Sequence, residues 1–175
     1  DLFAWLETLG SEDKETRFTK SDMKQLLDNE VQKYKQQYDE GVNKLRKAFN
    51  DMLDNEQVRK HLVEFAKHEF PNKNPEDVLV MAFHKLYDSY EYNYKYHKDK
   101  DIPQYARDAF DVLKDNESVR EYKNQSSIFN DLLSAYHSAA KDVERFDNID
   151  IPDDAVLIVP PREVGVKPDH NAFLI

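Results

Sequence analysis

Cysteine is absent from this sequence of 175 residues, and glycine occurs only three times. A chain without cysteine can form no disulfide, no thiolate metal site and no cysteine nucleophile. Three glycines leave little scope for the tight turns of a many-stranded β-fold. Long apolar runs are also missing, because the longest, Ala155–Pro161, is far too short to span a bilayer. These absences favour a helical, soluble protein of the cytoplasm that has no membrane contact.

Positive charge is in short supply, since 25 basic residues stand against 35 acidic ones and the net charge is −10. Such an acidic surface repels the phosphates of nucleic acids, so direct nucleic-acid binding is disfavoured. The chain contains no glycine-rich phosphate loop, no Gly-x-Ser-x-Gly elbow and no His-Glu-x-x-His motif. We therefore expect no catalytic residues, no bound metal and no cofactor.

The most regular feature of the sequence is an apolar stripe between residues 27 and 52. Its members recur every three or four residues, as positions on one face of an α-helix do: they are Leu27, Val31, Tyr34, Tyr38, Gly41, Leu45, Ala48 and Met52. The positions between them are mostly charged or polar, as a solvated back face requires. The pattern predicts one long amphipathic helix, and it favours continuity through Gly41 over a break there.

Capping signals divide the rest of the chain. Residues 2–9 are expected to form a short helix, and the polar segment 11–20 a loop. Thr19 with Asp22, or Ser21 alone, is expected to cap the long helix. Later helices are expected to open at Asp54, at Asn74-Pro75 (a helix over 75–98) and at Ile102-Pro103. A short helical turn is expected after Asp115-Asn116, followed by a cap at Ser126 or Ser127 that opens the last long helix.

These stretches predict an all-α fold: a bundle of about five to six helices over residues 1–146, built on the long amphipathic helix. Residues 147–175 hold four of the seven prolines and are expected to form an extended proline-rich tail. Within this tail, Val156–Val159 is a short apolar run with β-propensity. This run either lies on its own bundle or adds a strand to the sheet edge of a partner.

One pattern recurs 61 residues later in the chain. Arg46-x-Ala48-Phe49 followed by Asp54-Asn55-Glu56-x-Val58-Arg59 returns as Arg107-x-Ala109-Phe110 followed by Asp115-Asn116-Glu117-x-Val119-Arg120. One interpretation is a duplicated helical hairpin. The other is the same solution reached twice, in which Ala-Phe packs inward and Asp-Asn-Glu caps the next helix. Both interpretations predict helix, cap and helix at each place.

Five tyrosines fall within ten residues of the predicted helix over 75–98. Tyr87, Tyr90 and Tyr94 share one helix face, whereas Tyr92 and Tyr96 share another, so a single core cannot bury all five. Tyrosine is enriched in the hot spots of protein interfaces because it combines a large contact area with a hydroxyl group. The predicted partner-binding residues are therefore Tyr90, Tyr92, Tyr94 and Tyr96 of this helix and Val156, Leu157, Ile158 and Val159 of the tail.

Two other groups of polar residues have spacings that could suggest a metal site. His61, Glu64 and His68 share a helix face, but histidines seven positions apart lie roughly 10 Å apart along the axis, too far for one zinc ion. A solvated Glu–His face is favoured instead. Helical acid pairs bind Mg²⁺ in some all-α nucleotide pyrophosphatases, and three such pairs occur: Asp51/Asp54, Asp88/Glu91 and Asp108/Asp111.

The favoured function is a non-catalytic protein–protein interaction module that binds another protein or self-associates. The alternatives are an acidic inhibitor that mimics DNA and so blocks a nucleic-acid enzyme, and, less favoured, a Mg²⁺-dependent all-α nucleotide hydrolase. The composition, rich in Lys, Asn, Asp and Tyr and free of cysteine, resembles that of small accessory proteins of phages that infect low-GC hosts. No sequence motif accompanies this resemblance. It implies a viral accessory or structural protein of the virion or the host cytoplasm.

Overall fold

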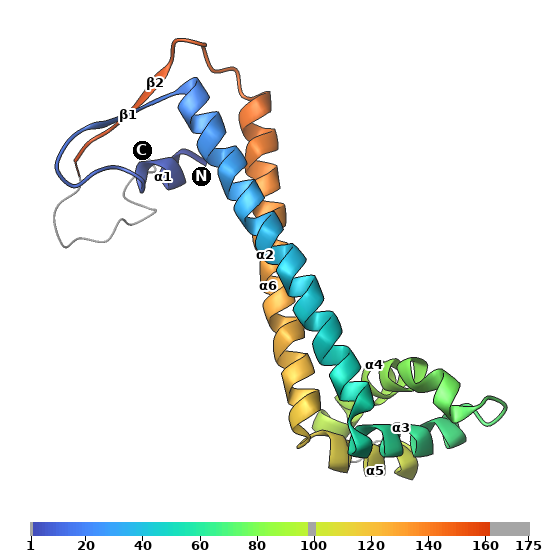
Figure 1. The fold of residues 1–175 in the computed structure, drawn as a ribbon. Coiled ribbons are helices and arrows are strands. Elements are labelled where there is room, and N and C mark those ends of the chain that lie inside the picture. Colours follow the sequence, from blue (N-terminus) through green and yellow to red (C-terminus); the bar gives the residue numbers. More distant parts are fainter. Residues whose placement is uncertain (1, 98–100, 162–175) are drawn as a thin grey trace. The chain divides into compact units, whose positions relative to one another are not determined.

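The computed structural model describes residues 2–97 and 101–161. The remainder of the predicted tail, 162–175, and the expected helix end at residue 98 lie outside the described residues. In chain order the elements are α1 (Leu2–Glu7), β1 (Thr16–Thr19), α2 (Lys20–Asp54), α3 (Glu56–Glu69), the 3₁₀ helix η1 (Pro75–Val78), α4 (Leu79–Tyr96), α5 (Gln104–Leu113), α6 (Glu117–Asn148) and β2 (Val156–Val159). Six α-helices dominate the part of the chain that is described (Figure 1), which confirms the predicted all-α fold class.

The long amphipathic helix of the prediction is α2, which has 35 residues. It passes through Gly41 without a break, as the continuity of the apolar stripe predicted. Its start is a reciprocal capping box. The Thr19 N–H donates to Asp22 Oδ2 at 3.0 Å, and the Asp22 N–H donates to Thr19 Oγ1 at 3.0 Å. The cap predicted at Thr19 is therefore confirmed.

β1 and β2 form an antiparallel two-stranded sheet in which Thr16 pairs with Val159 and Thr19 pairs with Val156. β1 lies in the segment 11–20, where the sequence predicted a loop, so that prediction is wrong for residues 16–19. Its four residues are too few to show a reliable strand alternation, and only the distant partner strand defines them as a strand.

Asparagine side chains cap the two helices that follow the repeated pattern. Asn55, rather than the expected Asp54, caps α3, because its Oδ1 accepts a hydrogen bond from the Val58 N–H at 3.2 Å. Asn116 Oδ1 accepts from two N–H groups at the start of α6, at 2.9 and 3.3 Å. The Asn116 Nδ2 group also donates to Asn55 Oδ1 at 3.2 Å, so the two equivalent caps bond to each other.

The last helix differs from its prediction. A short helical turn after Asp115-Asn116 and then a new cap at Ser126 or Ser127 were expected; the helix does start after Asn116, but it is one uninterrupted helix, α6, from Glu117 to Asn148. The two serines therefore lie inside a helix. Serine is a common cap but is also tolerated within helices, so the presence of the two serines wrongly predicted a second helix start.

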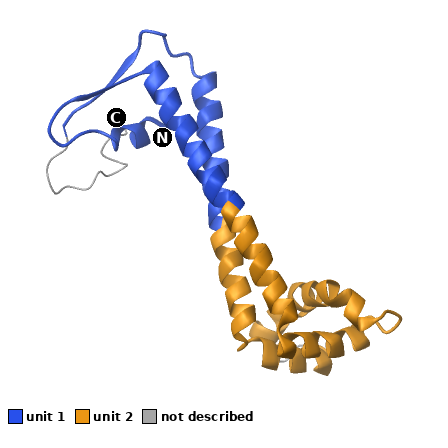
Figure 2. Cartoon of the chain, in the orientation of Figure 1, with its two compact units in different colours: residues 1–39, 131–175 blue, residues 40–130 orange. Residues whose placement is uncertain are grey.

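The chain divides into two compact units, shown in separate colours in Figure 2. Unit 1 consists of residues 1–39 and 131–175, and unit 2 of residues 40–130. The predicted boundary separates a bundle (1–146) from a tail (147–175), whereas the two compact units both contain parts of that bundle. The predicted boundary therefore stays a prediction.

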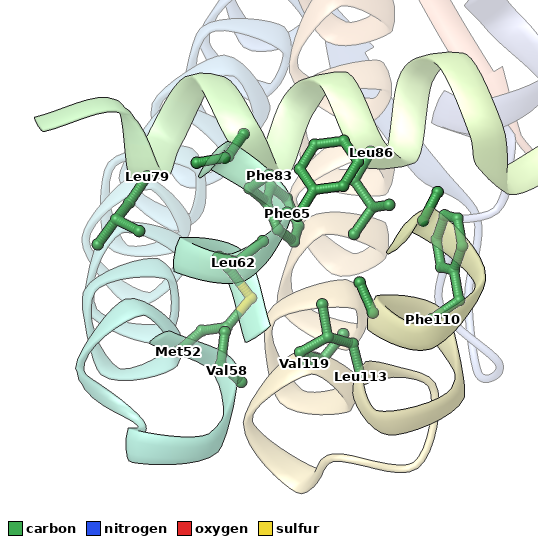
Figure 3. Close-up of a cluster of buried hydrophobic side chains, with 14 of the residues drawn as sticks. Met52, Val58, Leu62, Phe65, Leu79, Phe83, Leu86, Phe110, Leu113 and Val119 are labelled. Atoms are coloured by element: carbon green, nitrogen blue, oxygen red, sulfur yellow. The ribbon is translucent and has the colours of Figure 1, made fainter. Parts of the chain in front are cut away.

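Each unit has its own hydrophobic core. In unit 1, α1, α2 and α6 bury Leu2, Leu6, Met23, Leu27 and Phe146, and Leu157 of β2 packs against them. In unit 2, α3, α4 and α5 pack together with the adjoining parts of α2 and α6. Figure 3 shows that core, whose labelled residues are Met52, Val58, Leu62, Phe65, Leu79, Phe83, Leu86, Phe110, Leu113 and Val119.

Candidate functional site

α4 carries the tyrosine cluster and divides it between two faces. Tyr87, Tyr90 and Tyr94 pack against the core of unit 2. Tyr92 and Tyr96 point away from it and are 64% and 69% exposed. The structure therefore has the separation that helical spacing predicted, and it places Tyr90 and Tyr94 apart from the other two predicted binding residues.

The Tyr90 hydroxyl is committed to a partner inside unit 2. It donates to the carboxylate of Glu69, with oxygen–oxygen distances of 3.1 and 3.2 Å. The Tyr105 hydroxyl donates to the same carboxylate at 2.7 Å. The Glu69 side chain is only 12% exposed, and Lys85 Nζ lies 3.8 Å from it. Glu69, Tyr90 and Tyr105 thus link α3, α4 and α5, and the two hydroxyl groups stabilise the packing of these helices.

Burial and the neighbouring carboxylate change the acidity of these hydroxyls. Burial, followed by the charge of Glu69, raises the pKa of Tyr90 above its ordinary value. For Tyr105 burial again comes first and the hydrogen bond to Glu69 second, and both raise its pKa. Each disfavours the charged phenolate. Both hydroxyls therefore stay protonated and continue to donate at neutral pH.

Tyr94 and Tyr87 complete the inner face of α4. The Tyr94 hydroxyl donates to Asp111 Oδ1 at 2.6 Å. The Tyr87 hydroxyl is buried and has no hydrogen-bond partner among the described residues, while Lys123 Nζ lies over its ring, 4.5 Å from the centroid. Burial raises the pKa of Tyr87. Both rings also contact the ring of Phe110, so these two tyrosines pack within unit 2.

The outer face of α4 ends in three aromatic side chains that contact one another. The ring centroids of Tyr92 and Tyr96 lie 5.2 Å apart, and those of Tyr92 and His97 lie 5.1 Å apart. His97 is the C-cap of α4 and has a non-helical backbone (φ −130°, ψ 69°). We call Tyr92, Tyr96 and His97 the aromatic surface. Sequence reasoning missed His97, because helical spacing alone does not bring positions five apart together.

The predicted binding residues of the tail lie in β2. Leu157 packs on the core of unit 1, and Val159 is fully buried. Val156 and Ile158 point outward and are 45% and 49% exposed. The strand pairs with β1 of its own chain. The apolar run therefore lies on its own protein in this structure and not on the sheet edge of a partner. Of its four side chains, those of Val156 and Ile158 are exposed.

The helical acid pairs have close partners within the chain. Asp51 accepts from Lys47 at 2.8 Å, and Glu91 accepts from Lys123 at 2.7 Å. Asp108 accepts from Gln104 at 2.9 Å. Across the described ranges, no group of three or more histidine and acidic side chains is arranged to hold a metal ion.

His68 and Glu64 of α3 each contact a neighbouring side chain. The ring of His68 stacks on Tyr105 at a centroid distance of 4.9 Å, and Glu64 accepts from Lys67 at 3.0 Å. The hydrogen bond from Lys67 lowers the pKa of Glu64. Both side chains lie on the surface, in keeping with a solvated face.

Comparisons with protein-family models, with curated proteins and with solved structures found no match to this chain. None of the helices in the described part of the chain has the length and apolar character needed to cross a membrane.

Proposed function

We propose that this chain is a non-catalytic protein-binding module and that the aromatic surface on α4 is its contact with the partner. The observation that carries the proposal is the exposure of Tyr92 and Tyr96, while Tyr87, Tyr90 and Tyr94 of the same helix are partly buried against the core of unit 2. Large aromatic rings in mutual contact at the surface are typical of interface hot spots. Exposed apolar area of this kind gains free energy when a partner covers it.

The size of that gain limits what the aromatic surface does alone. Covering the exposed part of each tyrosine, roughly 100–150 Å², contributes about 3 kcal/mol at the usual area coefficient. Association costs about 4–15 kcal/mol of lost translational and rotational freedom, depending on the model. Two rings therefore anchor a contact but need neighbouring residues to complete it. We expect a partner surface that extends beyond Tyr92 and Tyr96.

The test compares immobilised wild type with Tyr92→Ala/Tyr96→Ala in capture from a cell extract, followed by mass spectrometry. A partner retained by the wild type and lost by the double variant supports the proposal. The matched control is Val80→Ala/Met81→Ala, which removes two exposed apolar side chains (45% and 46%) from the same helix outside the aromatic surface. This control should retain the partner. All proteins should show the same thermal unfolding midpoint.

Self-association is tested separately by sedimentation over a range of concentrations. If the partner is a second copy, the wild type forms a dimer and Tyr92→Ala/Tyr96→Ala remains a monomer. A partner that both proteins capture equally, and that salt releases, contradicts the proposal and favours the acidic DNA mimic instead.

A further inference from the structure

Unit 1 contains a pocket of about 320 Å³ between α1, α2 and α6. Trp5 of α1 and Tyr34 of α2 contribute aromatic walls, and Leu27 adds an aliphatic one. Small side chains at Ala135 and Ala139 of α6 leave the space that larger residues would fill. This volume falls in the range of small-molecule sites.

The polar groups of the pocket are acidic. Glu30 of α2 and Asp142 of α6 line it, and their side chains are only 27% and 34% exposed. Unit 1 as a whole has 18 acidic against ten basic residues, a net charge of −8, whereas the chain carries −10. The field of this unit attracts cations toward the pocket and repels anions.

Aromatic walls and carboxylates together define one ligand chemistry. The faces of tryptophan and tyrosine attract cations through the ring quadrupole, tryptophan most strongly. Carboxylates accept hydrogen bonds from ammonium, guanidinium and amidinium groups. Apolar walls take up the hydrocarbon body of such a molecule. A neutral ligand would use only the walls, and an anion would be repelled by both acids.

Side chains of the protein already use this chemistry at the pocket's edge. Lys33 Nζ lies 3.8 Å from Glu30 Oε1 and 5.1 Å from the centroid of the Tyr34 ring. Arg145 Nη1 lies 3.8 Å from Asp142 Oδ1. Both contacts join neighbours on one helix, involve exposed cations (Lys33 55% and Arg145 66%) and have long distances, so each is weak. They show that the carboxylates and the Tyr34 ring accept a cation without holding one tightly.

We propose that this pocket binds a small organic cation, with the charged group between Glu30 and Asp142 and the apolar body against Trp5 and Tyr34. The proposal is independent of the aromatic surface on α4, which belongs to unit 2. No residue of the pocket has a role in that surface, so either proposal can fail without the other.

Three isosteric probes test the ligand class: benzamidine, which is cationic, benzamide, which is neutral, and benzoate, which is anionic. Trp5 is the only tryptophan of the chain, so its fluorescence reports on the pocket directly. We expect benzamidine to give a saturable fluorescence change. Benzamide should bind at least about tenfold more weakly, because it lacks the cation–ring and ionic carboxylate contacts, and benzoate should not bind. Equal binding of benzamidine and benzamide, or no saturable binding of benzamidine, would overturn the proposal.

Charge variants then locate the cation. Glu30→Gln and Asp142→Asn should each weaken benzamidine binding about two- to fivefold, as expected for partly exposed ion pairs. Glu144→Gln is the control, because it makes the same charge change on α6 outside the pocket. If it weakens binding as much as the other two, the attraction is a general effect of the acidic unit and the assigned site is wrong.

A gain of affinity is the sharper test, because misfolding cannot produce it. Lys33→Gln removes the resident cation from Glu30 and Tyr34, so benzamidine should bind about two- to fivefold more tightly. Lys35→Gln makes the same charge change on α2 at an exposed residue away from the pocket. Equal effects of the two lysine variants would contradict the placement of the cation beside Glu30 and Tyr34.

Discussion

The hydrogen bond between the two equivalent asparagine caps provides the most exact test of the fold of unit 2. Asn116→Ala removes the acceptor of two N–H groups at the start of α6, which costs about 1 kcal/mol for a typical cap. It also removes the Nδ2 donor to Asn55 Oδ1, which costs about 0.5–1.5 kcal/mol for a partly buried hydrogen bond. We therefore expect a total loss of about 1.5–2.5 kcal/mol. Asn116→Asp retains the cap acceptor but loses the donor, so its loss should be about half as large.

The coupling between the caps follows from a double-mutant cycle. Asn55→Ala alone loses the cap of α3 and its own hydrogen bond to Ser118 Oγ, 3.2 Å long. Because the Asn55–Asn116 bond is removed by either single variant, the double variant should lose about 0.5–1.5 kcal/mol less than the sum of both. The measurement is urea unfolding followed by circular dichroism at 222 nm, with the denaturant slope required to stay constant. Additive losses, within about 0.3 kcal/mol, would refute the bond between the caps.

Three further outcomes follow from single contacts. Gly10→Ala should destabilise the protein by about 1–3 kcal/mol in urea unfolding, because an added Cβ would lie 2.6 Å from Cγ1 of the fully buried Val159. An unchanged unfolding midpoint would contradict the close packing of Val159 against Gly10. Tyr87→Phe should leave stability unchanged or raise it, since it removes a buried hydroxyl without a partner in the described structure. Tyr105→Phe should instead cost about 1.5–3 kcal/mol, because it removes a donor to the Glu69 carboxylate. The reverse order of the two losses would refute these assignments. The raised pKa of Tyr105 means that folding favours the protonated hydroxyl, so this hydroxyl stabilises the fold fully below the ordinary pKa of 10.0 and progressively less at higher pH. The difference in unfolding free energy between wild type and Tyr105→Phe should therefore shrink above pH 10. A difference that stays constant would contradict this assignment.

Much of the fold follows from local sequence signals. The stripe from Leu27 to Met52 predicted α2 because burial on one face repeats with the helical period. The spacing of the tyrosines also predicted that Tyr92 and Tyr96 lie on a different helix face from the other three, but it did not say which face is outward: Tyr90 and Tyr94, both predicted to bind a partner, pack against the core of unit 2. These signals succeed because neighbours on a helix are close in sequence, so one segment contains the whole pattern.

The parts that sequence reasoning missed depend on distant partners. β1 becomes a strand only through pairing with residues near position 158. The Glu69 carboxylate gains its tyrosine donors from two other helices, and no local pattern around Glu69 indicates them. The pocket in unit 1 likewise combines side chains of three helices. In each case the deciding contact joins segments that the sequence separates by many residues.

The division of the chain has a consequence for the order in which the protein folds. Unit 2 is one contiguous segment, whereas unit 1 joins two segments separated by residues 40–130. Bringing those segments together across an unstructured loop of that length costs about 4 kcal/mol of chain entropy. Prior folding of unit 2 shortens the effective loop and removes most of that cost. We therefore expect unit 2 to form first, as a nucleus that brings together the chain segments from which unit 1 is assembled.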